Sequence, residues 1–238
     1  MIRGLYTSAA GMVAQQVRLD VAANNLANAA TAGYRADVAS TAALPSQFLY
    51  RFNDAVRERG LLPSSPQPVG YLGTGAAVGQ VTTLTRGGFY RETGRELDFA
   101  LQGEGFFVVE TPAGERYTKN GAFQVNAAGQ LTTSEGFLVL TRSGAVALAD
   151  DPNLAENLAV VTTEQPATKV GDNLYAAQQV LMSDDTPVLQ GVLEEANLSP
   201  VEAMVDLITA MRTYEAGQKA IQTQDQTLDK LINEVGRV

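Results

Sequence analysis

The sequence predicts an α+β protein, with long N- and C-terminal helices pairing as a coiled-coil-like stalk and a central, mainly antiparallel β domain between them. Three observations favour this fold class. Apolar residues recur at alternating steps of three and four positions at both ends of the chain. The middle of the chain is rich in Val, Thr and Gly and carries closely spaced turn signals. A Pro- and Ser-rich stretch separates the first helix from this β-rich part.

The N-terminal helix is predicted from a stripe of apolar or small residues that continues for almost the whole of residues 2–26. The stripe consists of Ile2, Leu5, Ala9, Met12, Leu19, Ala23 and Leu26, with Gln16 filling its one gap. Ala32-Gly33 supplies a helix stop, because Gly readily adopts the left-handed conformation that ends helices. At 1.5 Å per residue this helix would be about 40 Å long.

The C-terminal helix is predicted over about residues 200–234, and its start is well signalled. Ser199 is placed at the N-cap, Pro200 at the first helical position and Glu202 where it completes a capping box. The apolar pattern again alternates steps of three and four. Its positions are Met204, Leu207, Met211, Tyr214, Gln218, Ile221, Asp225, Leu228, Ile232 and Val235.

The middle of the chain divides into a linker and a β domain. The run from Leu61 to Pro68 favours an extended or polyproline-like linker. From Phe89 to about Ala177 the pattern is that of β structure: Phe106–Val109 predicts a buried strand, and Asn120-Gly121 and Ala128-Gly129 predict tight turns. We therefore expect four segments: an N-terminal assembly helix (1–35), an extended linker with the first strands (36–88), a central β domain (89–190) and a C-terminal assembly helix (191–238).

Composition narrows the possible functions. The net charge is −9, and no run of three basic residues occurs, so nucleic acid is not an expected partner. The chain has no His and no Cys, which removes the commonest general base, the usual zinc ligands and thiolate nucleophiles. No apolar run approaches the roughly 20 residues of a membrane span. The N-terminus also lacks the continuous apolar region of a cleaved signal peptide.

Sequence motifs for catalysis or cofactor binding are weak. Acid–base work by a carboxylate pair would draw on Glu92, Glu96, Asp98, Glu104 and Glu110, but scattered acids on an acidic protein usually form a solvated face. The Gly73–Gly79 segment superficially resembles a phosphate-binding loop, yet it lacks the Gly-Lys-Ser/Thr of a Walker loop and leads into a strand-like run. We expect no catalytic residue, cofactor or metal site, and a structural protein rather than an enzyme.

The two terminal helices remain as the functional feature. Periodicity alone does not choose between pairing within one molecule and packing between copies. The polar positions Gln16, Gln218 and Asp225 would need partners if the stripes were enclosed, which favours assembly. Two isolated helices also have little apolar surface with which to hold each other, whereas many copies side by side bury both stripes.

Four motifs, in order along the chain, resemble the bacterial flagellar rod and hook family. Asn24-Asn25-Leu26-Ala27-Asn28 followed by Thr31-Ala32-Gly33-Tyr34 is similar to the family's N-terminal signature. The segments 97–107 and 117–131 resemble its Leu-Asp-x-Ala-x-x-Gly-x-Gly-Phe-Phe run and its Tyr-Thr-Arg-x-Gly-x-Phe hairpin. Residues 193–204, continued by Met211–Glu215, resemble the entry to its last helix.

This resemblance implies a subunit of the flagellar basal-body rod, in the cell envelope outside the cytoplasmic membrane. It implies polymerisation through the terminal helices, transmission of torque, and delivery by the flagellar type III export apparatus. The expected partners are copies of the chain and other rod and hook axial proteins, with no membrane-spanning segment. The expected assembly interface consists of Leu5, Met12, Leu19, Asn24, Asn25, Leu26, Asn28, Met204, Leu207, Met211, Tyr214, Ile221 and Leu228.

Finer expectations concern the type of subunit. The segments Tyr34–Asp37 and Val201–Met204 look closer to the proximal rod subunit than to the distal one. The stretch from Gly136 to Gly171 is shorter than the resemblance leads us to expect. The alternatives are the distal rod subunit, another axial protein of the family, or a non-flagellar binding module with helical arms. Asn24 and Asn28 share one helix face and are expected to bond to a neighbouring subunit, although they would also fray the helix end.

Overall fold

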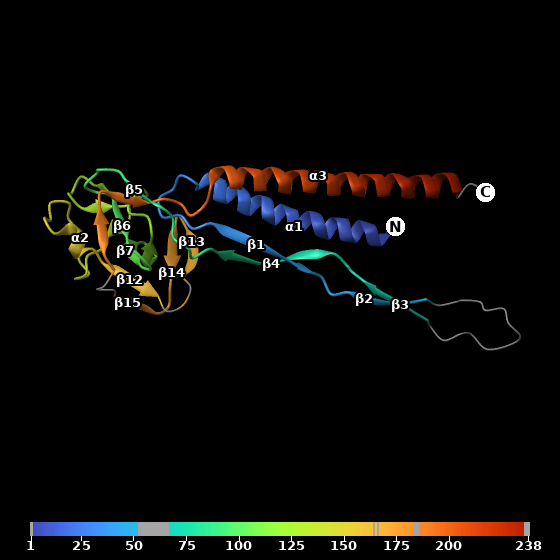
Figure 1. The fold of residues 1–238 in the computed structure, drawn as a ribbon, viewed down its shortest axis with the longest axis horizontal. Helices are drawn as coiled ribbons and strands as arrows, with labels where there is room; N and C mark the ends of the chain where they lie inside the picture. Colours follow the sequence, from blue (N-terminus) through green and yellow to red (C-terminus); the bar gives the residue numbers. More distant parts are fainter. Residues whose placement is uncertain (1, 52–66, 164, 166, 183–185, 236–238) are drawn as a thin grey trace, which may run out of the picture. The chain divides into compact units, whose positions relative to one another are not determined.

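A computed structural model describes residues 2–51, 67–163, 165, 167–182 and 186–235 (Figure 1). Its helices are α1 (Ile2–Ala27), the short α2 (Leu154–Asn157) and α3 (Pro200–Lys230), which continues as a π-helical turn at Leu231–Val235. The two long terminal helices and the α+β class are therefore confirmed. Most of the predicted 61–68 linker lies outside the described residues, and Gln67 and Pro68 belong to a strand.

Seventeen strands lie between the two long helices in the described part of the chain. The first six are β1 (Asp37–Ala43), β2 (Gln47–Arg51), β3 (Gln67–Leu72), β4 (Ala76–Thr83), β5 (Tyr90–Glu92) and β6 (Phe99–Leu101). The next six are β7 (Phe106–Thr111), β8 (Gly114–Thr118), β9 (Gln124–Val125), β10 (Leu131–Thr132), β11 (Leu138–Val139) and β12 (Val160–Thr163). The last five are β13 (Thr168–Gly171), β14 (Leu174–Ala176), β15 (Val180–Met182), β16 (Val188–Gln190) and β17 (Val192–Glu194).

The chain forms two compact units, each assembled from separate stretches of sequence. We call the first the helical unit: Met1–Ala23, Asp37–Thr82 and Met204–Val238. The second, the β unit, comprises Asn24–Ala36 and Thr83–Ala203. The last turn of α1 and the segment that follows it thus belong to the β unit, although the helix is continuous from Ile2 to Ala27.

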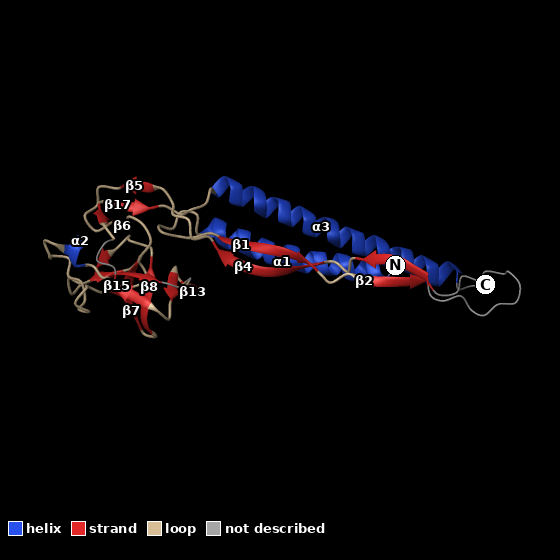
Figure 2. Ribbon diagram, turned by 60° about the horizontal axis from the view of Figure 1, so that its bottom comes forward, coloured by secondary structure: helices blue, strands red, loops and turns tan. Residues whose placement is uncertain are grey.

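The helical unit also contains two two-stranded β-ribbons: β1 pairs with β4, and β2 pairs antiparallel with β3 (Figure 2). Gly75, just before β4, lies against α1, because a Cβ there would be 3.2 Å from Ala10 Cβ and 3.6 Å from Thr7 Cα. The Gly73–Gly79 segment is therefore a loop followed by a strand, as expected from the absence of a phosphate-binding motif.

The β unit is built on a nine-stranded sheet with the order β13-β14-β8-β7-β11-β10-β9, to which β12 and β15 are added through β7. Its described pairings are antiparallel, which confirms the mainly antiparallel expectation. One face carries a core around Phe99, Phe107 and Phe123, all fully buried. A smaller cluster around Val108, Tyr117 and Tyr175 covers the other face.

Two predicted turns and one predicted helix N-cap can be compared with the structure. Ala128-Gly129 forms the predicted turn, with Gly129 at φ 79°. The prediction at Asn120-Gly121 is wrong: the strands on either side, β8 and β9, pair with other strands instead of with each other. A Cβ on Gly121 would lie 1.7 Å from the carbonyl oxygen of Phe99, so this glycine allows a close backbone approach. At the start of α3, Ser199 Oγ accepts the Glu202 backbone N–H at 3.5 Å, as expected for an N-cap.

Candidate assembly interface

Only one narrow stripe of helix α3 is covered by the rest of the chain, and the remainder of the helix surface is exposed. Every residue between Pro200 and Asn233 that is not exposed belongs to one pattern, with alternating steps of four and three. We call these residues the inner stripe: Ala203, Leu207, Ala210, Tyr214, Gly217, Ile221, Gln224 and Leu228. The predicted positions Leu207, Tyr214, Ile221 and Leu228 lie in this stripe. The positions between them lie one residue earlier than the sequence suggested.

The displaced positions are exposed. Met204 and Met211 are 50% and 53% exposed, and Gln218 and Asp225 are also exposed. Together with Val201, Val205 and Ile208, the two methionines form a second apolar stripe on α3, which we call the outer stripe. Its five side chains are between 44% and 71% exposed. The polar Gln218 and Asp225 are in solvent, so they no longer need partners within a seam.

Helix α1 shows the same one-residue displacement. Leu5, Met12, Leu19 and Leu26 are half-buried, whereas Ala9, Gln16 and Ala23 are exposed. Ser8, Gln15 and Ala22 lie between the large ones and are less exposed, and outside this pattern Ala14 is buried, at 2% exposed. The glycines of the two helices show where α1 meets α3 within the helical unit: Gly4 lies against the Gln224 amide, and Gly217 lies against Met12.

The ribbon formed by β2 and β3 carries an aromatic face that sequence reasoning missed. Phe48 lies 5.0 Å from Tyr50 and 4.9 Å from Tyr71, measured between ring centroids, in edge-to-face geometry. Phe48, Tyr50 and Tyr71 are 40%, 53% and 78% exposed. The period-two spacing of Phe48 and Tyr50 placed both on one strand face, but only the β2–β3 register brings Tyr71 opposite Phe48.

The Asn-rich signature is engaged within its own chain. The Tyr34 hydroxyl donates to Asn24 Oδ1 at 2.7 Å and lies 3.1 Å from Asn25 Oδ1. The Asn28 side-chain amide donates to the Asn24 carbonyl at 2.9 Å. Such bonds from Asn side chains compete with the backbone hydrogen bonds of a helix. Helix α1 ends at Ala27, before the expected Ala32-Gly33 stop.

The exit segment, which we define as residues 31–36, is clamped inside the β unit. The Gly33 amide donates to the Glu194 carbonyl at 2.7 Å, and the Asn197 side-chain oxygen accepts the Ala36 amide at 2.7 Å. From another strand, the Lys169 ammonium lies 4.1 Å from the centre of the Tyr34 ring. Gly33 has φ 67°, and a Cβ there would lie 2.3 Å from the Lys119 carbonyl oxygen, so only glycine fits.

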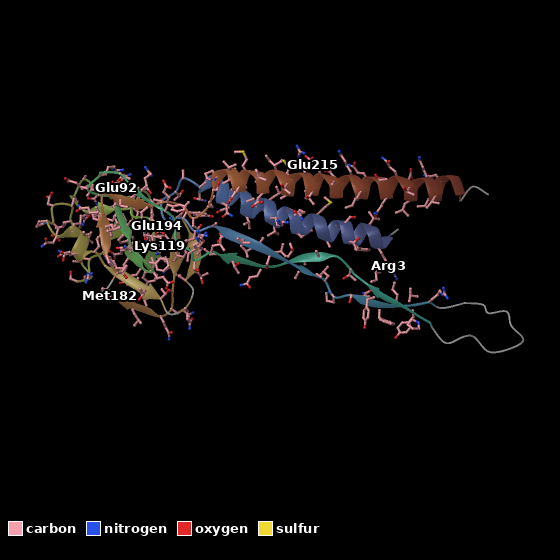
Figure 3. All side chains as sticks on the ribbon, viewed as in Figure 1. Arg3, Glu92, Lys119, Met182, Glu194 and Glu215 are labelled. Atoms are coloured by element: carbon pink, nitrogen blue, oxygen red, sulfur yellow. The ribbon has the colours of Figure 1, made fainter. Side chains whose placement is uncertain are left out.

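A buried ion pair completes the clamp. Arg35 Nη2 lies 2.7 Å from Glu194 Oε1, with side chains only 6% and 3% exposed. Glu194 Oε1 also accepts the Gly88 amide at 3.0 Å. Lys119 lies in the same unit, as Figure 3 shows, and its ammonium donates to the Gly103 carbonyl at 2.9 Å. Burial lowers the pKa of Lys119 to about 8, with Glu194 opposing the shift and Arg35 adding to it.

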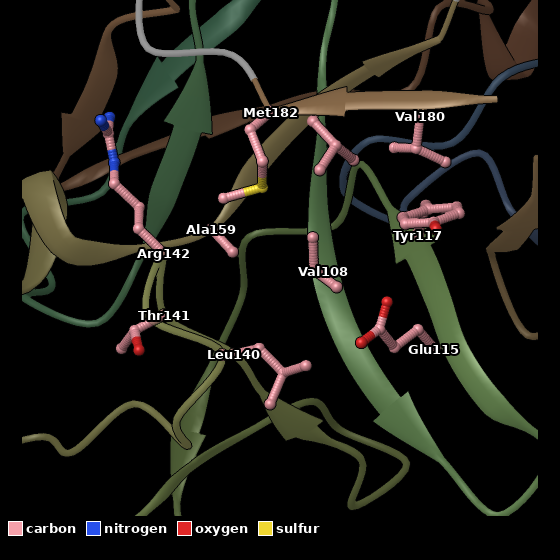
Figure 4. Close-up of a pocket in the computed structure, with 11 residues that line it drawn as sticks. Val108, Glu115, Tyr117, Leu140, Thr141, Arg142, Ala159, Val180 and Met182 are labelled. Atoms are coloured by element: carbon pink, nitrogen blue, oxygen red, sulfur yellow. The ribbon is translucent and has the colours of Figure 1, made fainter.

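A pocket of about 240 Å³ opens on the second face of the sheet (Figure 4). Val108, Leu140, Ala159 and Val161 give it an apolar lining, and Glu115 and Arg142 also border it. On the Glu115 side, burial and then the Glu115 charge raise the pKa of Tyr117. The pocket thus adds an apolar surface to the β unit without a group of reactive side chains.

The acidic residues weighed as a catalytic pair do not meet in this pocket. Glu92, Glu96, Glu104 and Glu110 are exposed. Asp98 is buried, and its Oδ2 accepts the Thr93 hydroxyl at 2.7 Å. Over the described residues, no three His, Cys, Asp or Glu side chains gather as a metal site would require. None of the helices in the same residues has the length and apolar character needed to cross a membrane.

Three stretches of the chain match families of flagellar proteins. Residues 5–35 match the flagella basal body rod protein family, and residues 100–171 match the D1 domain of flagellar hook protein FlgE/F/G. Residues 189–234 match the C-terminal region of flagellar basal body rod FlgEFG protein. The first and third matches contain most of α1 and α3, and the second contains the central strands of the large sheet.

Curated relatives align with almost the whole chain. Flagellar basal-body rod protein FlgG of Agrobacterium fabrum is 33% identical over 259 residues, covering 94% of this chain and 96% of its own. FlgG of Caulobacter vibrioides is 31% identical over 258 residues, covering 95% and 97%. Flagellar hook-basal body complex protein FlhO of Bacillus subtilis is 29% identical over 284 residues, covering both chains completely. These relatives carry the name FlgG or FlhO, which does not support the preference for the proximal subunit. The chain belongs to the flagellar basal-body rod and hook family, as a structural rod subunit of the basal body.

Proposed function

We propose that this protein is the distal rod subunit, of the kind named FlgG, and that copies of it polymerise through their terminal helices. The full-length similarity to FlgG proteins supports the distal rod identity, and the division of α3 into two apolar stripes is the observation that carries polymerisation. The inner stripe is covered, whereas the outer stripe of Val201, Met204, Val205, Ile208 and Met211 is exposed. A contiguous exposed apolar surface on a protein of an assembling family fits an interface between subunits.

In this proposal, α1 and α3 of one chain pair as a coiled-coil-like stalk, which corresponds to the predicted assembly segments 1–35 and 191–238. The large inward residues Leu5, Met12, Leu19, Leu207 and Tyr214, together with Leu26, Ile221 and Leu228, serve this pairing. Met204 and Met211 face neighbouring copies. Asn24, Asn25 and Asn28 keep their bonds around Tyr34 and offer their remaining polar groups to a neighbour.

We further infer that the subunit transmits torque and reaches its place through the flagellar type III export apparatus. Torque transmission requires a connection that does not yield between the helices and the β unit. At the β-unit end of that connection, the Arg35–Glu194 pair, Asn197 and Lys169 hold the exit segment within the β unit, which supports this inference. The expected partners are other copies and other rod and hook axial proteins.

The proposal is tested by deleting the gene and examining swimming and hook assembly. The deletion strain is expected to be non-motile and to lack hooks, and the natural gene should restore both. Normal swimming without the gene would overturn the proposal. Electron microscopy of basal bodies that carry a labelled copy then distinguishes the distal from the proximal rod by the position of the label.

The full-length similarity to FlhO favours a second candidate within the same family. In that case the protein is a hook–basal body component other than the principal distal rod subunit. The labelling experiment separates the two: a label along the length of the distal rod supports the first candidate, and a label confined to one narrow zone supports the second.

A further inference from the structure

Two glycines receive side chains from the opposite helix in the helical unit. A Cβ on Gly217 of α3 would lie 2.8 Å from Met12 Cγ and 3.5 Å from Met12 Sδ. A Cβ on Gly4 of α1 would lie 2.9 Å from Gln224 Nε2. Both distances are shorter than an ordinary contact allows, so each glycine leaves a notch that a side chain of the other helix occupies: Met12 at Gly217, and the flexible amide end of Gln224 at Gly4.

The two contacts define an antiparallel register. Met12 lies after Gly4 in the sequence of α1. Its partner Gly217 lies before Gln224, the partner of Gly4, in the sequence of α3, so the two helices are antiparallel. One heptad further along, the same spacing sets Leu19 opposite Ala210. Ala210 is one of the two buried residues in the described part of α3, at 5% exposed. A large residue of α1 thus meets a small residue of α3 again.

Two of the three layers between these follow the converse rule, and in the third Tyr214 lies opposite Gln15. In the same register Ile221 lies opposite Ser8, and Leu207 lies opposite Ala22, which is 8% exposed. Here the large residue belongs to α3 and the small one to α1. Alternating large and small residues in facing positions lets two helices interdigitate without cavities.

We propose that Gly217 and Gly4 set the register of α1 against α3, by admitting Met12 and Gln224 respectively. This inference deepens the proposed function, on which the importance of the register for assembly rests. Heptad pairings alone tolerate a slip of seven residues, because large would again meet small. A slip would move Met12 onto Ala210, whose Cβ occupies the space that Gly217 leaves open, and would remove Gln224 from Gly4. The two notches therefore distinguish the register from its slipped alternative.

The register decides which apolar residues remain outside. With Met12 at Gly217, the inner stripe faces α1, and Met204 and Met211 stay on the outer stripe. A slipped or rotated pairing would displace the outer stripes of successive copies relative to one another. The two glycines are thus positioning residues for the surface that other copies use.

Disulfide cross-linking of the purified full-length chain tests the register. The natural chain has no Cys, so engineered pairs are free of background. The in-register pair is Ser8→Cys with Ile221→Cys, and the slipped pair is Ser8→Cys with Tyr214→Cys. The two α3 positions are seven residues apart, which is roughly 10 Å along the helix and beyond the reach of a disulfide. We expect the in-register pair to form its intramolecular disulfide at least about tenfold faster. Equal rates, or a faster slipped pair, would overturn the proposal.

A second comparison tests the notch itself. Gly217→Leu is added separately to the in-register pair and to the slipped pair, and it is expected to reduce the ratio of their disulfide formation rates at least several-fold. Gly11→Leu is the matched control, because a Cβ on Gly11 of α1 would meet nothing within 4 Å, and it should leave the preference unchanged. If Gly217→Leu lowers helicity, Gly217→Ala replaces it. An unchanged preference with either filled notch refutes the role of Gly217.

These outcomes are separate from those of the proposed function. Cross-linking of the purified chain reports the helix register whether or not the protein forms a rod. The deletion strain reports the rod function whatever the register is. A normal register in a protein that is dispensable for swimming would refute only the proposed function, and a slipped register in an essential rod protein would refute only the inference.

Discussion

Glu194 and Glu195 are adjacent in the sequence but have opposite surroundings. Glu194 is 3% exposed and pairs with Arg35, whereas Glu195 is 47% exposed and pairs with Arg91 at 2.9 Å. Removing one partner of a buried pair leaves an uncompensated charge in the interior, but solvent screens an exposed pair. The same chemical change therefore has different consequences at the two positions.

Glu194→Ala is expected to lower the free energy of unfolding of the β unit by roughly 3–5 kcal/mol. Its control, Glu195→Ala, should cost less than about 1 kcal/mol. Urea denaturation followed by circular dichroism measures both. Similar losses for the two variants would contradict the assignment of Arg35–Glu194 as the pair that holds the exit segment.

Lys119 makes stability depend on pH. Its pKa is about 8 in the folded protein, against an ordinary 10.5, so the unfolded chain binds more protons between these values. Stability should therefore rise with pH above about 8. The raised pKa of Tyr117 acts in the opposite direction, but only near and above its ordinary value of 10. Between pH 8 and 10 we expect a gain of roughly 2 kcal/mol from Lys119.

Urea midpoints of the natural chain at pH 7.5, 8.5 and 9.5 should increase in that order. The Lys119→Met variant, which carries no titrating group at this position, should show a much flatter profile. The assignment fails if the natural chain shows no increase or if the variant retains the full slope.

At the scale of the elements, the two stripes of α3 have separate consequences. Leu207 belongs to the covered inner stripe, and Met211 belongs to the exposed outer stripe. A charge at Leu207 disturbs the packing of the inner stripe within its own chain. A charge at Met211 remains in solvent in the isolated subunit and meets an apolar surface only when another copy packs against it.

We expect Leu207→Asp, like Leu19→Asp, to loosen the helical unit and block assembly while the β unit stays folded. Met211→Asp should also block assembly but leave the isolated subunit as stable as the natural chain, within about 0.5 kcal/mol. Motility on soft agar and thermal unfolding of the purified variants measure the two effects. Assembly of the Met211→Asp protein into normal rods would exclude the outer stripe from the interface.

Hydrogen exchange should distinguish the helices from the exit segment in dilute, isolated subunits. The amides of residues 2–23 and 204–230 are expected to exchange quickly, because only one narrow stripe of α3 is covered by the rest of the chain. The amide of Gly33, bonded to the Glu194 carbonyl within the β unit, should be protected. Strong protection throughout α1, equal to that of Gly33, would show that the helices need no neighbouring copy.

At the scale of the whole molecule, charge is divided unevenly between the two units. The β unit contains eight basic and seventeen acidic residues, whereas the helical unit contains nine of each. The net charge of −9 therefore belongs to the β unit. Neutral helical units of neighbouring copies can pack without net repulsion, whereas crowded β units repel one another over about 8–10 Å at ordinary salt concentrations.

Assembly of the purified protein in vitro should consequently become more favourable as salt rises from 50 to 300 mM. Sedimentation of the assembled fraction measures this. A variant with Glu110→Gln, Glu135→Gln and Glu156→Gln, all exposed positions of the β unit, should show a weaker salt dependence. An assembled fraction that falls with salt would indicate that attraction between opposite charges controls assembly instead.

The sequence by itself determined the two terminal helices, the β texture between them and the large inward residues Leu207, Tyr214, Ile221 and Leu228. These features depend on local propensity and periodicity, which are properties of neighbouring residues. The same periodicity could not decide which residue between two large ones is covered. A step of three followed by four and a step of four followed by three both span the same seven residues. The apolar Met204 and Met211 favoured the wrong side.

Only the tertiary structure decided that Ala203, Ala210 and Gly217 lie in the covered stripe, with the methionines outside. It also brought Arg35 to Glu194 and Tyr71 to Phe48, contacts that depend on strand pairing across long stretches of sequence. Which face of a helix is covered depends on what packs against it. That partner lies about 200 residues away in the chain, beyond the reach of any local pattern.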